Sequence, residues 1–367
     1  MGRRHIDFAI TRLRVSTPEP HARLSVLLVN YNGAELLKDC VASLQRTGAH
    51  RYQVIVVDND STDQSLEFLS KVPWVKVVRS RCNRGFAGGN NLGLKECQGD
   101  YVLLLNNDTI VTPGFLESLC EHLDRNPHVG AAQGKMVLPR YGNSLDVCGS
   151  FFTALGLPYH YGYFKPDGPK YQRSYPVFSG KGACLMFRRE LIEKVGGFLF
   201  DEEFFCYYEE SDFCHRVWLA GYEVHFVPSA PIEHLMGATG DRILKQEIVQ
   251  RHYLRNMMFS LLGNLSAPSL MRILPAFFGV LMFRMTAFLV TLNWAQLRAH
   301  WGAFAYNVHH WKRIRTRRQL IKNIRKTSDQ EIFAKVLKTP RLQYFVKTFQ
   351  GRIRDYEDED LAINGRQ

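Results

Sequence analysis

The chain has 367 residues, of which 46% are hydrophobic, and its formal net charge is +12. This length and apolar content exclude a largely disordered protein and leave room for one large or two smaller folded domains. The charge is unevenly distributed. Residues 1–240 carry 25 Lys and Arg against 26 Asp and Glu, residues 241–354 carry 21 against 4, and residues 355–367 carry 1 against 5. The sequence therefore predicts an enzyme-like first part and a basic, surface-binding second part.

The eight cysteines show neither a C-x-x-C pair nor another paired metal-ligand spacing. We interpret them as core thiols of a protein in a reducing compartment. The first residues contain no apolar run long enough for a signal peptide, so they do not indicate secretion.

From residue 24 onward, short β-rich apolar runs alternate with amphipathic segments, which is typical of a wound α/β sheet. Strands are predicted at residues 24–29, 53–57, 75–78 and 101–105, and helices at residues 34–46, 64–70 and 112–124. A Ser-x-x-Gln capping box at Ser61 and a Thr-Pro pair at Thr112 predict the starts of the second and third helices.

Polar clusters follow these strands at residues 30–33, 58–61, 81–91 and 106–108. The carboxyl ends of parallel strands share one edge of a sheet, where such folds bind ligands. We therefore expect the four clusters to line one crevice.

Residues 139–178 contain five prolines, five glycines and many tyrosines. We interpret them as loops on the side of the crevice where a second substrate, the acceptor, would bind. An ordered segment at residues 182–188 and a short helix at residues 190–195 follow, and the next two glycines end that helix. A helix at residues 209–219 and a last strand at residues 222–227 complete the predicted domain.

Two groups of acids are candidates for chemistry. Asp108 follows five apolar residues, so it stands at the mouth of the sheet, where a carboxylate can bind Mg²⁺ or Mn²⁺ bridging two phosphates. Alternatively, it caps the next turn together with Thr109. Residues 207–212 place three carboxylates beside aromatic side chains, which favours a raised pKa for at least one of them. A helix dipole alone also attracts acids to such a position.

Five segments, in this order, resemble the family 2 glycosyltransferases with the GT-A fold, and within them the rhamnosyltransferase-like branch. They are residues 25–33, 56–63, 83–91, 103–109 and 197–212. The resemblance covers residues 24–240 and implies a Rossmann-like α/β domain that binds a nucleotide sugar. It further implies inverting transfer of rhamnose or a related hexose from a dTDP- or UDP-linked donor to a lipid-linked or cell-envelope glycan.

The resemblance assigns donor contacts to seven residues: Asn30, Tyr31, Asp58, Asn83, Gly85, Asn90 and Asn106. Asp108 matches the last acid of the family's Asp-x-Asp metal motif. The first acid is replaced by Asn106, which leaves Asp108 as the main carboxylate ligand of Mg²⁺ or Mn²⁺. His234 matches a late histidine that completes the metal site, although a lone histidine is more often a structural residue.

The family's general base is the second acid of a Glu-Asp pair, and Glu210 stands at that position, one methylene longer than the usual Asp. Asp212 is the alternative base. The base would take the proton from an acceptor hydroxyl as that oxygen attacks the anomeric carbon. Glu209 and Gly180 are expected on the acceptor side, although the glycine-rich segment at residues 179–183 can also be a plain lead into a strand.

Residues 273–292 are apolar apart from Arg284 and two threonines, and they contain Pro275. Their length is that of a membrane span, but the internal arginine favours a helix that lies in the membrane interface or re-enters it. Tryptophans and the basic run at residues 312–318 follow, a combination suited to anionic headgroups. The alternative is a buried helical subdomain with a solvated basic face. No nucleic acid partner is expected, because no recognisable motif accompanies the basic cluster.

The predicted organisation is a GT-A domain followed by a C-terminal helical, membrane-associating extension, peripheral to the cytoplasmic side of the inner or plasma membrane. Its parts are an N-terminal extension (1–22), the GT-A domain (23–240), the basic helical region (241–354) and an acidic tail (355–367). A catalytically inactive nucleotide-sugar or carbohydrate-binding protein on the same fold remains an alternative because of Asn106 and Glu210. A dinucleotide-dependent oxidoreductase is disfavoured, because no G-x-G-x-x-G follows the first strand.

Overall fold

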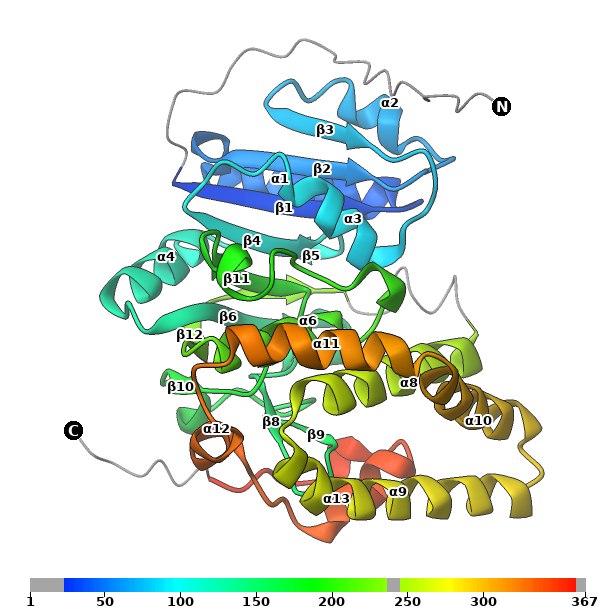
Figure 1. Ribbon diagram of the computed structural model, residues 1–367. Coiled ribbons are helices and arrows are strands. Elements are labelled where there is room, and N and C mark those ends of the chain that lie inside the picture. Colours follow the sequence, from blue (N-terminus) through cyan, green and yellow to red (C-terminus); the bar gives the residue numbers. More distant parts are fainter. Residues whose placement is uncertain (1–22, 236–244, 361–367) are drawn as a thin grey trace, which may run out of the picture.

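The computed structural model describes residues 23–235 and 245–360 (Figure 1). The predicted N-terminal extension, the predicted domain boundary at residue 240 and residues 361–367 of the predicted tail lie outside the described residues. Figure 1 shows a sheet with helices on its faces in the upper part of the molecule and a group of helices in the lower part.

The sheet has ten strands in the order β10-β12-β6-β11-β4-β1-β2-β3, with β5 paired to β12 and β7 paired to β6. Strands β1 to β4 are mutually parallel, whereas β11 runs antiparallel to both of its neighbours. The strands are β1 (Leu24–Asn30), β2 (Gln53–Asp58), β3 (Val75–Arg79), β4 (Tyr101–Asn106), β5 (Thr109–Ile110), β6 (Val129–Leu138), β7 (Ser144–Leu145), β10 (Tyr175–Pro176), β11 (Cys184–Arg188) and β12 (Glu223–His234). A separate hairpin consists of β8 (Ser150–Phe152) and β9 (Pro158–His160).

The predicted wound α/β architecture is confirmed, with a buried cluster on each face of the sheet. Alternate residues of β1 point to opposite faces, so Leu28 joins one cluster and Leu27 the other. The first cluster is covered by α1 and α4, and the second by α3, α6 and the C-terminal helices. Both faces are covered, which is why the parallel strands read as continuous apolar runs. The helices of this part are α1 (Ala34–Arg46), α2 (Ser65–Leu69), α3 (Gly85–Leu94), α4 (Phe115–Arg125), α5 (Leu191–Lys194) and α6 (Glu209–Leu219).

The strands at the lower edge of the sheet differ from the prediction. The sequence pattern does not predict β6, because this strand mixes small, polar and apolar residues, yet it is buried between β11 and β12. β12 is predicted to end at residue 227 but continues to His234. A register shift between Val227 and Ile232 lets the strand bend and pair with β6 again. This continuation places His234 at the carboxyl edge.

Both predicted helix starts are wrong for the same reason. Helix α2 begins at Ser65, and the Ser61 hydroxyl instead accepts the backbone N–H of Asn32 at 3.1 Å. Helix α4 begins after Gly114, and the Thr112 hydroxyl donates to the carbonyl of Pro231 at 2.9 Å. Each predicted cap is engaged by a segment distant in sequence.

The C-terminal helices share the core of the sheet domain, since side chains of α8 and α9 belong to the same buried cluster as β11 and α6. They are α8 (Gln246–Asn264), α9 (Ala267–Val290), α10 (Trp294–His309), α11 (Trp311–Ile324), α12 (Asp329–Val336) and α13 (Leu342–Phe349). Single 3₁₀ turns occur at Ala49–Arg51, Pro139–Tyr141, Pro169–Tyr171, Glu202–Phe204 and Ile353–Asp355.

The basic run at residues 312–318 is predicted to face anionic headgroups, but α11 turns part of it inward. Arg317 is buried in ion pairs, and Arg318 donates to two carbonyls at the end of α8. Lys312 and Arg315 are exposed. Residues three or four apart share a helix face, so a continuous basic run is divided between both faces. Only its outer half is available to an anionic surface.

Candidate active site

The polar clusters after β1, β2 and β4 meet at one sheet edge, as predicted. Asn30 is in register with Asp58, and Val29 with Asn106. The fully buried Asn30 side chain donates to Ser65 Oγ at 2.9 Å and accepts from Asn107 Nδ2 at 2.7 Å. Asn30 therefore fixes the loops after β2 and β4 relative to each other.

Asp58 lies at the end of β2 with 2% of its surface exposed. Its Oδ2 accepts the backbone N–H of Ser61 at 3.3 Å, whereas its buried Oδ1 accepts no hydrogen bond from the described residues. Burial raises the pKa of the Asp58 carboxyl. Buried polar atoms are normally hydrogen-bonded, so an orphaned acceptor indicates a place for a ligand donor group. Tyr31, half-buried, follows the neighbouring strand end.

The loop before α3 is held against the acidic segment. Asn83 Oδ1 accepts the backbone N–H of Gly85 at 2.8 Å, and Asn59 Nδ2 donates to the same oxygen at 3.1 Å. Gly85 has a φ of 67°, and a Cβ at this position would collide with the carbonyl of Phe205. Only glycine permits this close approach. Asn90 is buried in α3 and donates to the Phe86 carbonyl at 2.9 Å, so it braces its own helix.

Asp108 and His234 come together at the ends of β4 and β12. Asp108 Oδ1 lies 3.4 Å from Nε2 of His234, and both side chains are almost completely buried. His234 Nδ1 lies 2.7 Å from Oδ2 of Asp146, and Lys181 Nζ lies 2.8 Å from both oxygens of Asp146. A continuous series of polar contacts thus runs from Asp108 through His234 and Asp146 to Lys181.

The charges of Asp146, His234 and Lys181 in this series of contacts compensate one another. Burial alone would raise the pKa of Asp146, but Lys181 and His234 outweigh it and hold this pKa well below its usual range. Burial alone would lower the pKa of His234, but the adjacent carboxylates of Asp108 and Asp146 outweigh it and raise this pKa. The ionised Asp146 therefore orients the imidazole.

This arrangement fits a divalent metal ion. Asp108 Oδ1 is buried and accepts no well-directed hydrogen bond from the described residues, so a ligand position is available beside His234 Nε2. A histidine whose other ring nitrogen contacts a carboxylate is the usual arrangement of a metal-ligating histidine. Asn106 lies at the end of β4, two residues before Asp108, and is half-buried. It has an amide side chain where the resemblance implies an acid.

The acids at the start of α6 have strongly perturbed protonation. Burial, followed by repulsion from its neighbour Glu210, raises the pKa of Glu209 well above its usual value. Burial also raises the pKa of Glu210, although the Gly182 backbone N–H and the charge of Lys181 oppose this shift. Glu210 is half-buried, so it is the more accessible of the two. A carboxylate with a raised pKa is suited to proton transfer near neutral pH.

Asp212, predicted as the alternative base, is buried and paired with side chains of α6, α8 and α11. Its carboxylate oxygens lie 2.8 and 2.9 Å from Arg317 Nη1, and Arg216 Nε and Asn264 Nδ2 complete its hydrogen bonds. Burial would raise the pKa of Asp212, but Arg317 and Arg216 lower it well below its usual range. A carboxylate so completely paired cannot accept a proton from a substrate, and it instead joins α6 to the C-terminal helices.

Gly180 is also placed by packing, because a Cβ there would meet Leu185 and Gln133. The backbone N–H of Lys181 donates to Gln133 Oε1 at 2.9 Å, which fixes this glycine-rich segment before β11. Sequence reasoning missed Asp146 and Lys181. Lys181 lies within the glycine-rich segment that the sequence singled out, whereas Asp146 carries no local signal, because it follows a short strand in a region predicted as loop.

Known proteins support the assignment of the domain. Residues 25–196 match the model of the family described as "Glycosyl transferase family 2". A hexosyltransferase of low-salt glycan biosynthesis from Haloferax volcanii is 28% identical over 203 residues, which cover 53% of this chain and 61% of the relative. The N-acetylglucosaminyl-diphospho-decaprenol L-rhamnosyltransferase of Mycobacterium tuberculosis is 28% identical over 234 residues, which cover 58% of this chain and 75% of the relative. The chain thus spans less than two thirds of the length of the haloarchaeal relative.

The fold has counterparts among solved structures. GalNAc-T7 with UDP, GalNAc and Mn²⁺ superposes with a TM-score of 0.53 at 18% identity, covering 67% of this chain and 48% of that one. TarS of S. aureus in complex with UDP-GlcNAc gives a TM-score of 0.50 at 17% identity, covering 70% and 73%. Residues 25–196 therefore form a glycosyltransferase family 2 domain, and the strand order together with these structural likenesses shows its GT-A fold.

Proposed function

We propose that the protein is an inverting, metal-dependent glycosyltransferase that moves rhamnose or a related hexose from a dTDP- or UDP-linked donor to a lipid-linked or cell-envelope glycan. One observation carries the proposal. Asp58 Oδ1 and Asp108 Oδ1 are both buried at the same sheet edge, and neither accepts a hydrogen bond of good geometry from the described residues. The edge therefore offers one acceptor to the nucleoside and another to the metal of a diphosphate. The mycobacterial relative's name, a rhamnosyltransferase, supports the choice of sugar.

In this mechanism Glu210 accepts the proton of the acceptor hydroxyl as its oxygen attacks the anomeric carbon. The positive charge of Lys181 opposes the rise that burial causes in the pKa of Glu210. Asp108 and His234 would hold Mg²⁺ or Mn²⁺, which offsets the charge of the departing diphosphate when bound. Asp146 orients His234 throughout.

A binding experiment tests the donor site. Nucleotide sugars should raise the Tm of the protein only when Mn²⁺ or Mg²⁺ is present, because ligands that bind the folded state stabilise it by about 2.7 kcal/mol at 100 times Kd. The Asp108→Ala variant should lose this stabilisation. Asp39→Ala, which changes an exposed acid of α1, is the matched control and should retain it.

Equal, metal-independent Tm shifts in Asp108→Ala and Asp39→Ala would contradict the metal site. Metal-dependent binding of the donor without turnover by the wild type would favour the inactive binding protein.

The proposal includes docking of the helical region onto an anionic membrane surface. Among the described residues, α9 is the one helix long and apolar enough to cross a membrane. One of its faces is buried against the protein through Ile273, Phe277 and Leu281. Its other side chains are half-buried or exposed, and the exposed fraction reaches 59% for Met282, 69% for Phe283 and 77% for Val290. Because α9 is held along the body of the protein, we infer that it lies in the membrane interface.

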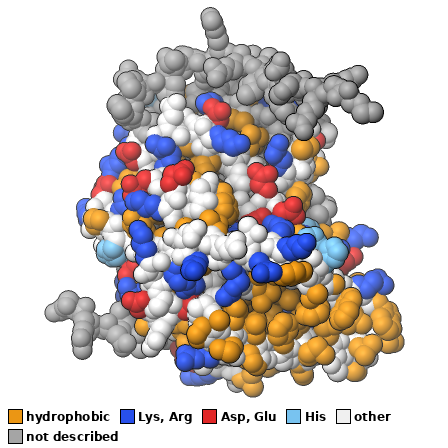
Figure 2. Space-filling model, viewed as in Figure 1, with side chains coloured by type: hydrophobic (Ala, Val, Ile, Leu, Met, Phe, Trp, Pro, Cys, Tyr) orange, Lys and Arg blue, Asp and Glu red, His pale blue; other side chains and the backbone are white. Residues whose placement is uncertain are grey.

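Figure 2 supports this orientation. Exposed hydrophobic side chains gather over the lower right of the view, where α9 and α10 lie, and lysine and arginine side chains border them above. Monomeric proteins rarely expose an apolar patch this extensive without a partner. Basic side chains beside it favour anionic headgroups.

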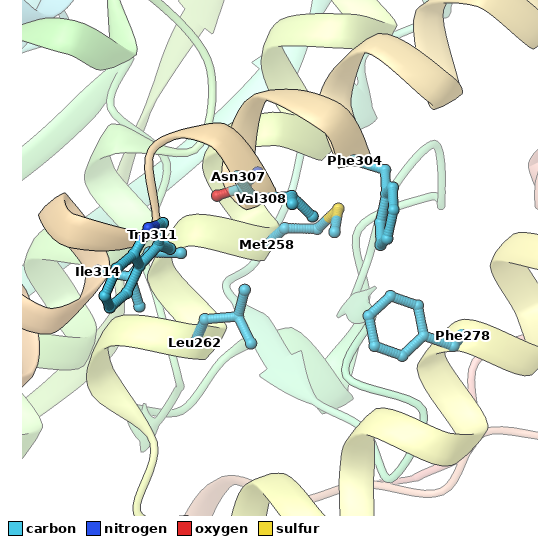
Figure 3. Close-up of a pocket in the computed structure, with 8 residues that line it drawn as sticks. All are labelled: Met258, Leu262, Phe278, Phe304, Asn307, Val308, Trp311 and Ile314. Atoms are coloured by element: carbon cyan, nitrogen blue, oxygen red, sulfur yellow. The ribbon is translucent and has the colours of Figure 1, made fainter.

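An apolar groove opens within the same region (Figure 3). Its volume is about 410 Å³, and it lies between α8, α9, α10 and α11. Phe278 and Phe304 lie edge to face at one end, with ring centroids 6.1 Å apart, and Trp311 lies at the other end. Met258 and Leu262 form the floor between them. Such a groove offers hydrocarbon a place to dock, in keeping with a lipid-linked acceptor.

Sedimentation with liposomes tests the membrane proposal. The triple variant Met282→Gln, Phe283→Gln and Val290→Gln should bind anionic liposomes at least about tenfold more weakly for each side chain, since burying such a side chain contributes about 1.5–3 kcal/mol. The double variant Ile248→Gln and Leu337→Gln, which changes other exposed apolar residues, is the control. Deleting the helical region is unsuitable, because its helices contribute to the shared core. Unchanged sedimentation of the triple variant would refute the docking surface.

A further inference from the structure

A second group of potential metal ligands lies at the opposite end of β12 from His234. His128, Glu223 and His225 each present one ligand atom, and these atoms all lie within 4.8 Å of one another. Glu223 and His225 stand at the amino end of β12, and His128 directly precedes β6. In Figure 1 this end of the sheet is on the left, beside α4 and α12, whereas the parallel strands β1 to β3 point toward the right.

The backbone holds these three residues in place. The N–H of Glu223 donates to the carbonyl of His128 at 2.9 Å, and Glu223 is in register with Val129 of the adjacent parallel strand. A register shift falls between Glu223 and Val224, and the side chains of Glu223 and His225 meet with His225 Nε2 2.8 Å from Glu223 Oε2. Strand pairing therefore holds Glu223 and His225, and the backbone hydrogen bond from Glu223 holds the turn that carries His128 beside them.

Two further side chains orient the ligand atoms. His122 Nε2, from α4, lies 3.1 Å from His225 Nδ1, which leaves His225 Nε2 directed at Glu223 Oε2, 2.8 Å away. Lys335 Nζ, from α12, lies 2.5 Å from the other oxygen of Glu223. A ligating histidine commonly has its second ring nitrogen engaged in this way, and a carboxylate ligand commonly has a second partner.

The donor set indicates the kind of ion. Two imidazoles and one carboxylate oxygen suit zinc and similar transition metals, whose bonds to these ligands are about 2.0–2.2 Å long. Tetrahedral coordination at that length places ligand atoms about 3.3–3.6 Å apart. Here all three ligand atoms lie within 4.8 Å of one another, and His225 Nε2 lies 2.8 Å from Glu223 Oε2. His128 is exposed, which gives an ion access from solvent.

We propose that His128, Glu223 and His225 bind a zinc-type transition-metal ion, distinct from the donor-site metal, at the amino edge of the sheet. The ion would join the start of β12 to the segment between α4 and β6. Through Lys335 and Glu223 it also lies next to α12 of the helical region. It would therefore stabilise the contact between the sheet and the C-terminal helices, at the end of β12 remote from Asp108.

Cobalt binding to the full chain tests the proposal independently of transferase activity. In an Asp108→Ala background, which weakens the donor-site metal, the protein should bind one Co²⁺ per chain with the visible absorption of a tetrahedral complex, and Zn²⁺ should displace it. Adding His128→Ala should weaken Co²⁺ affinity at least about tenfold. His128 is exposed, so this change should leave the fold intact, as circular dichroism would verify.

His50→Ala in the same background is the matched control, because His50 is an exposed histidine outside the cluster. It should bind Co²⁺ as the Asp108→Ala protein does. Glu223→Gln is a second test and should also weaken binding while preserving a neutral partner for His225. Equal Co²⁺ affinity of the His128→Ala and His50→Ala proteins, or absence of the tetrahedral absorption, would overturn the site even if the protein proves to be an active transferase.

Discussion

Replacing Glu210 with Gln should lower kcat for sugar transfer by about 10²–10⁴-fold, because a positioned general base contributes about that much. The amide keeps the size of the side chain but cannot accept the acceptor's proton. Binding of the nucleotide sugar should remain nearly unchanged, because the oxygens proposed above to bind it and its metal belong to Asp58 and Asp108. Steady-state transfer kinetics and donor titration measure the two effects separately.

The pH dependence gives this prediction a direction. Burial raises the pKa of Glu210, so the wild-type kcat should increase with pH through a value above that of an ordinary glutamate. This limb should be absent from the residual activity of Glu210→Gln. Glu209→Gln is the comparison that shows whether Glu210 or its more buried neighbour Glu209 produces this limb of the pH profile. A loss of donor binding in Glu210→Gln would assign this residue to metal binding or folding instead of proton transfer.

Replacing Arg317 with Met should destabilise the protein by about 3–5 kcal/mol, because the change leaves a buried carboxylate without its main partner. Arg317 contacts Asp212 through Nη1 and Asp201 through Nη2. Its guanidinium also lies 5.2 Å from the ring centres of Phe198 and Phe259. Denaturant unfolding of the full chain would measure the change in free energy.

Lys312→Ala on the same helix is the control and should change stability by no more than about 0.5 kcal/mol, since Lys312 is exposed. The two partners of the pair should also be coupled, so that adding Asp212→Leu to Arg317→Met destabilises less than the sum of the single changes. Because the pKa of Asp212 is lowered in the folded state, its contribution is present above the unfolded-state pKa of about 3.9 and is lost as pH falls further. Equal stability of Arg317→Met and Lys312→Ala would show that the pair does not secure the helical region.

The sequence alone predicts the parts of the site that depend on local patterns. The strand ends near Asn30, Asp58 and Asp108 were identifiable because each follows an apolar run of strand length. Parallel pairing then brings such ends to one edge whatever the details of the loops. The helix at α6 was predicted at its observed bounds, because its acidic start and apolar interior are local features. The caps at Ser61 and Thr112 were wrong, because distant segments compete for these hydroxyls.

Partnerships between distant residues required the tertiary structure. Asp146 approaches His234 across 88 positions of sequence, and Arg317 approaches Asp212 across 105. The same holds for His128 and His225, which strand pairing alone brings together. The sequence by itself determined that the chain has a wound α/β domain with acids at its carboxyl edge and a basic, apolar region after it. Only the tertiary structure decided which of these charges face each other, because a charged side chain carries no local mark of its partner and burial selects the pair.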